Sequence, residues 1–303
     1  MAAMMSRLKA AVIGPGGIGG MIGVLLGSRG NIVSCIGSPN KVAEKYRRSL
    51  HLRSHYYGNF SEDLYWSDSI DFPVDVIFFT VKAPSLINAI NRVSTHICQK
   101  AIVISLLNGL GHQEILRDRF ANVVIGTIGS VESEKIHNGL IQHNSSNAAR
   151  IELAQNQSVD DARLSCITER MNESGLETVI RNDETQVIWG KLSRLCPLSS
   201  ITSYFREPLG EILINPKKMV ILENLIAEVV IVAKSFGYET DCSTILKQIN
   251  SLPFDLRTSM QKDLEAQNSS EIEAILGEVV RKYKLLSTKR STLESVYNTL
   301  LER

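Results

Sequence analysis

The sequence lacks the features that mark several large classes of protein. Its net charge at pH 7 is only +1, so no bulk electrostatic attraction to nucleic acid or to a membrane surface is expected. Its five cysteines are odd in number and widely spaced, without a C-x-x-C pair, which excludes a disulfide framework and a zinc site. We therefore expect a cytoplasmic protein with reduced thiols, no metal, no nucleic-acid partner and no membrane partner.

Charged side chains are absent from Ala10 to Ser28, a run long enough to cross a membrane. Seven of these 19 residues are Gly and one is Pro, so the run offers little side chain to bury in lipid and lacks the apolar core of a signal peptide. A strand over residues 9–13, a turn over 14–19 and a helix ended by Gly30 account for the glycines. A Gly-rich structural turn is the alternative.

Strand, turn and helix in this order are the context that the G-x-G-x-x-G pattern requires. Gly14 permits a tight turn, Gly16 lets the backbone approach a pyrophosphate, and Gly19 lets the helix pack closely on the strand. The N–H groups at the helix N-terminus face the anion. The sequence therefore predicts a dinucleotide-binding loop formed by Gly14, Pro15, Gly16, Gly17, Ile18 and Gly19.

Apolar β-branched runs alternate with helical patterns through the first half of the chain. This alternation predicts a parallel sheet covered on both faces. We predict an α/β fold, with an N-terminal Rossmann-type doubly wound domain over residues 1–180 and an all-helical C-terminal domain over 181–303. The strand runs cover residues 31–37, 74–83, 101–111 and 122–131, and two more, 139–145 and 150–155, are predicted to be a pair of edge strands. The main helices are predicted over 184–195, capped by Asn182 or Asp183, and over 216–237.

The loop after the second predicted strand bears on the choice of cofactor. An NAD site usually places Asp or Glu there, to hold the ribose 2′-hydroxyl. This chain has "GSPNK" at residues 37–41, without an acid, and the Arg that is usual for NADP is also missing. NADP (as NADPH) is therefore favoured, with Ser38, Asn40 and Lys41 as candidate phosphate contacts.

Four further polar residues have both a structural and a functional interpretation. Lys82 and Asn108 follow apolar strands, where a solvated Lys and an Asn-Gly turn are the ordinary readings. Lys191 lies at the margin of an apolar helical stripe, where it either snorkels to solvent or loses solvent and has a lowered pKa. Ser270 and Glu273 fit a capping box, which leaves the neighbouring carboxylate of Glu271 for another role or for the helix dipole.

The order of these residues is more specific than any one of them. With "GPGGIG", "VKA", "NGLG", "GTIGSVESEKIHNGLIQH", "WGKL" and "TSMQKDLEAQNSSEIEAILG", the chain resembles the ketopantoate reductase (2-dehydropantoate 2-reductase) family over nearly its full length. The resemblance implies a Rossmann domain joined to a helical domain, NADPH as cofactor, and reduction of the 2-oxo acid ketopantoate to pantoate in pantothenate biosynthesis. A homodimer is a possible assembly.

The resemblance also implies roles for individual residues. Lys191 is expected to be the general acid, and Glu271 to bind on the cofactor side and orient the substrate hydroxyl. Lys82 and Asn108 are expected to contact cofactor and substrate. Ser259 is expected to contact the substrate carboxylate, and Ser199 to contribute to substrate binding.

The chain departs from the family pattern where the family usually has three Asn residues, which are here Leu195, Ser199 and Leu209. Fewer amides hold a polar substrate, so the reaction type is better supported than the substrate. One alternative is a reductase of a different, less polar 2-oxo acid. Another is a catalytically weak NADP-binding regulatory relative, against which the presence of both Lys191 and Glu271 argues.

Overall fold

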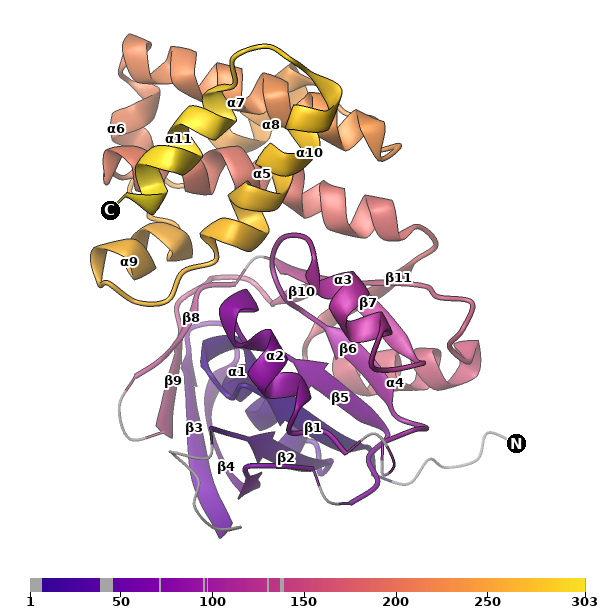
Figure 1. Ribbon diagram of the computed structural model, residues 1–303. Coiled ribbons are helices and arrows are strands. Elements are labelled where there is room, and N and C mark those ends of the chain that lie inside the picture. Colours follow the sequence, from indigo (N-terminus) through magenta and orange to yellow (C-terminus); the bar gives the residue numbers. More distant parts are fainter. Residues whose placement is uncertain are drawn as a thin grey trace. The chain divides into compact units, whose positions relative to one another are not determined.

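The chain folds into two compact units in a computed structural model, which describes residues 7–38, 46–70, 72–94, 96, 98–129, 131–136 and 139–302 (Figure 1). The first unit runs through Leu107 and again from Gln113 to Val187. The second consists of the short loop Asn108–His112 and the chain from Ile188 onward. The boundary between the two units at Val187 and Ile188 therefore lies within one long helix. The loop Asn108–His112, which follows a strand of the first unit, belongs to the second unit.

One sheet forms the centre of the first unit, with eleven strands in the described residues in the order β11-β10-β7-β6-β5-β1-β2-β4-β3-β9-β8. The strands are β1 (Lys9–Ile13), β2 (Ile32–Ile36), β3 (Tyr46–Ser54), β4 (Gly58–Ser67), β5 (Val76–Phe79), β6 (Ile102–Ser105), β7 (Val123–Gly129), β8 (Ser133–Lys135), β9 (Leu140–His143), β10 (Arg150–Ala154) and β11 (Glu177–Arg181). The helices of this unit are α1 (Gly17–Gly27), η1 (Ala83–Ser85), α2 (Leu86–Ile90), α3 (His112–Arg117) and α4 (Asp161–Glu173).

The middle of the sheet is parallel and buried. Strand β1 pairs in parallel with β2 on one side and β5 on the other, and β6 and β7 continue the parallel series beyond β5. Every residue of β5 and of β6 is buried, as expected for strands with both faces covered. The predicted N-terminal Rossmann-type doubly wound domain is confirmed.

The prediction that residues 139–145 and 150–155 form a pair of edge strands is wrong, because β8 and β11 are the edge strands of the described sheet. Strand β9 lies between β3 and β8, whereas β10 lies between β7 and β11 on the other side of the sheet. The reason is non-local packing. A Cβ on Gly20 of helix α1 would lie 2.6 Å from Ile141 Cδ1, and a Cβ on Gly126 of β7 would lie 2.7 Å from Leu153 Cδ2. The two strands bury their side chains against different elements.

The second unit is helical, as predicted. Its core contains Trp189, Leu222, Leu225, Ile275 and Val279. Its elements are the part of α5 (Glu184–Phe205) that follows Val187, α6 (Leu209–Leu213), α7 (Pro216–Ser235), α8 (Cys242–Asn250), α9 (Ser259–Glu265), the π-helical turn η3 (Glu273–Gly277), α10 (Glu278–Leu286) and α11 (Thr292–Leu301). Among the described residues, no helix combines the length and the apolar character that a membrane span requires.

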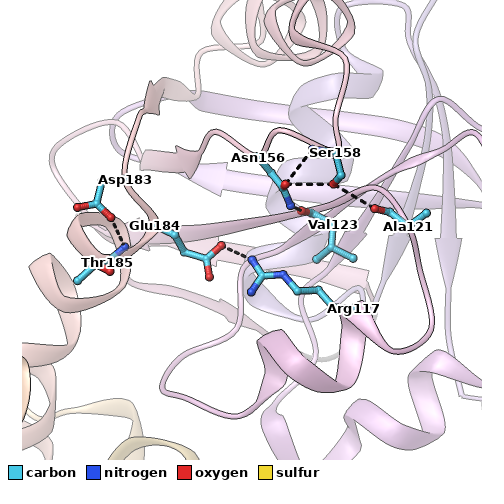
Figure 2. Close-up of polar contacts among 8 residues, drawn as sticks. All are labelled: Arg117, Ala121, Val123, Asn156, Ser158, Asp183, Glu184 and Thr185. Carbon is cyan, nitrogen blue, oxygen red and sulfur yellow. Dashed lines mark hydrogen bonds and ion pairs between the residues drawn. The ribbon is translucent and has the colours of Figure 1, made fainter. Parts of the chain in front are cut away.

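The start of α5 is fixed within the first unit (Figure 2). Asp183 Oδ1 accepts a hydrogen bond of 2.8 Å from the backbone N–H of Thr185, so Asp183 provides the cap. The next residue, Glu184, forms an ion pair with Arg117 of α3. From this anchored first turn the helix continues into the second unit, past Pro197, to Phe205, which is ten residues beyond the predicted end at 195.

Candidate active site

The turn after β1 has the shape that the glycine pattern predicts. Gly14 has a φ of +87°, a region that side chains other than Gly rarely adopt, and a Cβ there would lie 2.5 Å from Val81 Cγ1. A Cβ on Gly19 would lie 2.2 Å from Thr80 Oγ1 and 2.9 Å from Val12 Cγ1. The tight turn at Gly14 and the close packing of α1 on β1 at Gly19 therefore both need glycine.

Gly16 differs from its neighbours because the described residues leave space beside it. A Cβ on Gly16 would have Gly14 O, at 3.9 Å, as its nearest neighbour among them. Gly16 is the N-cap of α1, makes no side-chain cap, and is followed by a first turn without an acidic residue. The first N–H groups of a helix have no partner within it. This arrangement of N–H donors beside open space fits a pyrophosphate.

A lysine that the sequence analysis missed lies beside this turn. Lys135 Nζ donates to Pro15 O at 3.1 Å and lies 4.9 Å from the centre of the Trp66 ring. The neighbouring Ser133 Oγ donates to Gly17 O at 3.0 Å. More than 110 residues separate β8 from the turn in sequence, so no local pattern reveals the contact. It adds a positive charge next to the proposed anion site.

Of the other predicted cofactor contacts, Ser38 follows β2 and is half-buried. Lys41 and Asn40 lie outside the described residues. Lys82 is exposed and is the N-cap of η1, and it follows β5, the strand that pairs with β1, after Thr80 and Val81. Ser38 and Lys82 thus both lie just beyond the carboxyl ends of parallel strands adjacent to β1, where doubly wound folds bind ligands.

Three predicted residues meet in the second unit. Asn108 Oδ1 accepts a hydrogen bond of 2.6 Å from Lys191 Nζ. Asn108 Nδ2 donates one of 2.9 Å to Glu271 Oε2. Glu271 is buried, and Asn108 and Lys191 are half-buried. The Asn108 amide thus bridges the lysine ammonium and the glutamate carboxylate, with its oxygen toward the cation and its NH₂ group toward the anion.

The loop that carries Asn108 is held against the π-helical turn η3. The backbone N–H of Leu110 donates to Ala274 O at 2.9 Å, and Gly109 has a φ of +83°. A Cβ on Gly109 would lie only 2.1 Å from Ala274 O. Because η3 begins two residues after Glu271, this close approach brings Asn108 beside that carboxylate. Such π-turns are frequent at functional sites.

The predicted capping box of Ser270 and Glu273 is wrong. The helical segment begins at Ile272, so Glu271 rather than Ser270 directly precedes it, and Ser270 is not in the N-cap position. Its carboxylate reaches forward instead, accepting hydrogen bonds from Arg281 Nη1 at 3.0 Å and from the hydroxyl of Tyr297. These contacts tie η3 to α10 and α11.

Loss of solvent around Lys191 changes its acidity. The pKa of the Lys191 ammonium is lowered from 10.5 to about 8, chiefly because burial disfavours its charge. The negative charge of Glu271 opposes this shift, and the positive charge of Arg194 contributes to it. A lysine with a pKa near 8 can donate a proton at neutral pH and recover it readily, as a general acid must.

The two serines predicted to bind substrate lie on different helices. Ser199 is buried in α5, and Ser259, the first residue of α9, is exposed. Leu195 is partly buried, and Leu209 is fully buried in the core of the helical unit. Among the described residues, no group of three or more His, Cys, Asp or Glu side chains could hold a metal ion.

Comparison with known proteins follows the same division of the chain. The family model described as ketopantoate reductase PanE/ApbA matches residues 10–156, and the model of its C-terminal part matches residues 183–303. The chain belongs to the ketopantoate reductase family. Membership confirms the resemblance inferred from the motifs and places the protein among the oxidoreductases.

Relatives of this ketopantoate reductase family member extend over nearly its whole length. The uncharacterized oxidoreductase YkpB of Bacillus subtilis is 28% identical over 300 residues, which are 97% of this chain and 98% of that protein. The ternary structure of a D-mandelate dehydrogenase with NADH and anilino(oxo)acetate gives a TM-score of 0.82 at 19% identity, covering 97% and 98%. A dimeric ketopantoate reductase from Staphylococcus aureus gives 0.79 at 22%, with the same coverage. The two structures show that the fold is shared.

Proposed function

We propose that the protein catalyses the NADPH-dependent reduction of a 2-oxo acid, with ketopantoate as the first substrate to test. The observation that supports this most is the contact of Lys191, through Asn108, with Glu271, together with the lowered pKa of the lysine. A ketopantoate reductase and a D-mandelate dehydrogenase share the fold. The names of both relatives are consistent with chemistry between a 2-oxo acid and a 2-hydroxy acid.

The chemistry follows from the charges in the site. Bound NADPH would supply a hydride to the carbonyl carbon of the 2-oxo acid. As the carbonyl oxygen gains negative charge, the Lys191 ammonium stabilises it and donates the proton that completes the hydroxyl. Asn108 Oδ1 holds the ammonium in place by accepting a hydrogen bond from one of its N–H groups. Glu271 keeps the amide oriented and favours the protonated lysine.

Residues of the first unit are proposed to hold the cofactor. The turn Gly14–Gly19 would bind the pyrophosphate, with Ser38, Lys41 and Lys82 as further contacts. In the second unit, Ser199 and Ser259 would contribute to substrate binding. A homodimer and a cytoplasmic location complete the proposal, the former consistent with the dimeric S. aureus relative.

A substrate panel tests the proposal directly. Oxidation of NADPH by the purified protein is followed with ketopantoate, with its analogue 2-oxoisovalerate, which lacks the hydroxymethyl group, and with phenyl-2-oxoacetate. The proposal expects turnover of at least one of these acids, with the matching 2-hydroxy acid as product. If none is reduced, or if NADPH does not bind, the protein is not a reductase of this class.

A second candidate function is reduction of a less polar 2-oxo acid. Leu195 stands where the family usually has Asn and is only partly buried, so it removes a hydrogen-bond donor. Leu209, at another such position, is fully buried among apolar neighbours, so an amide there would lie in the core. This candidate is favoured if 2-oxoisovalerate or phenyl-2-oxoacetate has a higher kcat/KM than ketopantoate.

Leu195→Asn is expected to raise kcat/KM for ketopantoate. One hydrogen bond to an uncharged group contributes about 0.5–1.5 kcal/mol, which corresponds to about a 2- to 12-fold gain. The kcat/KM for 2-oxoisovalerate should not rise, because that acid lacks the hydroxyl. Leu195→Ala is the control, since it removes the leucine without adding an amide. An equal gain in both variants, or none in Leu195→Asn, would contradict this interpretation of Leu195.

Gly109→Ala is expected to lower kcat by at least about tenfold more than Gly111→Ala. Both glycines have similar positive φ angles, +83° and +88°, so alanine is strained at either position. Only at Gly109 would the new Cβ collide with Ala274 O, because at Gly111 the nearest neighbour, Glu278 Oε1, is 3.7 Å away. Steady-state kinetics of the two variants give the comparison. Similar kcat values would show that the close approach to η3 does not position Asn108.

A further inference from the structure

The carbonyl that follows β2 is bound by an arginine from a distant part of the chain. Arg92 Nη1 donates to Gly37 O at 2.6 Å, across 55 residues of sequence. Arg92 follows α2 and its C-cap Asn91, and its own carbonyl accepts from the N–H of Ile70 at 3.1 Å. Its side chain is half-buried, and the contact lies wholly within the first unit.

This arginine lies one strand away from the Gly-rich turn. Ile13 and Ile36 are paired at the carboxyl ends of β1 and β2, and the N–H of Gly14 donates to Ile36 O at 3.1 Å. In doubly wound folds the pyrophosphate lies at the turn after the first strand, and the group on the ribose 2′ carbon lies at the end of the second. The end of β2 is where Arg92 brings its guanidinium.

The charge at this position suits a phosphate. A guanidinium has five N–H donors, and its bond to Gly37 O uses one of them. Among the described residues Arg92 forms no ion pair. The stretch "GSPNK" that follows β2 has no carboxylate that would hold a ribose hydroxyl or repel a phosphate. Arginine binds phosphate oxygens through paired, charge-assisted hydrogen bonds.

We infer that Arg92 selects the cofactor by binding the ribose 2′-phosphate of NADPH. The stretch "GSPNK" after β2 has no arginine, and Arg92 supplies the guanidinium from the end of α2 instead. The inference rests on the proposed dinucleotide-binding function of the first unit. It does not depend on Lys191 or on the identity of the 2-oxo acid.

Binding measurements test the role of Arg92 without any turnover. The affinities of NADPH and NADH are measured by calorimetry for the wild type, Arg92→Gln, Arg92→Lys and Arg163→Gln. Arg163 is a matched control, because its Nη2 also donates to a backbone carbonyl, Lys100 O, at 2.6 Å. That carbonyl precedes β6 and therefore lies at the amino ends of the parallel strands, whereas Gly37 lies at their carboxyl ends.

Arg92→Gln is expected to weaken NADPH binding by about 10- to 100-fold and NADH binding by less than threefold, since only NADPH has the 2′-phosphate. Arg92→Lys should fall between wild type and Arg92→Gln, and Arg163→Gln should change neither affinity. Equal weakening of both cofactors would mean that Arg92 only holds the Gly37 loop, and would overturn the inference. A wild type without preference for NADPH would also overturn it while leaving a dinucleotide site. A wild type that binds neither cofactor would refute the proposed function itself.

Discussion

Replacing Lys191 with methionine is expected to lower kcat for 2-oxo acid reduction by about 100-fold or more. Methionine keeps an apolar stem of similar length and removes the ammonium that stabilises the developing negative charge and donates the proton. NADPH affinity should change much less, because the proposed pyrophosphate site belongs to the first unit and Lys191 to the second. Steady-state kinetics and cofactor titration of the same preparation give both quantities. A variant that keeps more than about half of the wild-type kcat would contradict the role of Lys191.

Stability provides the control for Lys191→Met. The lysine pKa is about 8 in the folded protein and 10.5 without the fold, so the unfolded chain binds the proton more tightly. Lys191 therefore destabilises the fold below pH 8, and this cost diminishes as the pH rises from 8 to 10.5. Methionine removes this cost together with the hydrogen bond to Asn108 Oδ1, so Tm at pH 7 is expected to change little. A lost rate with an undiminished Tm separates chemistry from misfolding.

Gly16→Val is expected to weaken NADPH binding by about 100-fold or more while the protein stays folded. The backbone of Gly16, with φ −83° and ψ −150°, is extended and accepts other residues. Apart from its neighbours in the chain and the backbone of α1, the described atom nearest to the added Cβ is Gly14 O at 3.9 Å, so valine would extend into the space proposed for the pyrophosphate. Calorimetric titration with NADPH, alongside circular dichroism, measures both effects.

Gly23→Ala is the matched control for Gly16→Val. It lies further along the same helix, α1, where a Cβ would make an ordinary contact of 3.5 Å with Leu64 Cδ1. This variant should bind NADPH like the wild type, because Gly23 is buried away from the first turn. Tight NADPH binding by Gly16→Val would remove the basis for a phosphate site at this turn.

Elements with strong local patterns were predictable from the sequence. The strand β1, the turn at Gly14 and the helix α1 follow from the spacing of glycines after an apolar run. The cap at Asp183 follows from its place before a helical pattern. These features depend on contacts between residues close in sequence, and the all-helical character of the second unit has the same origin.

Features that depend on distant contacts were not predictable. Nothing near β9 in sequence shows that Ile141 packs against Gly20 of α1. The contacts of Lys135 with Pro15 and of Arg92 with Gly37 likewise join segments far apart in the chain.

Within the candidate site, the order of Asn108, Lys191 and Glu271 along the chain was informative through the family resemblance. The contacts among these three side chains could not be predicted from any local pattern, because they depend on the packing of the loop after β6 against η3.

The pH dependence of kcat/KM for the best 2-oxo acid, at saturating NADPH, tests the central claim most directly. This ratio reports the groups that must be correctly protonated before the acid binds. Because the reaction requires the Lys191 ammonium, kcat/KM should fall as the pH rises through about 8 rather than through the ordinary lysine value of 10.5. The fall should be absent from the residual activity of Lys191→Met. A wild-type profile that stays flat to pH 10, or a fall near pH 8 that persists in Lys191→Met, would show that another group donates the proton.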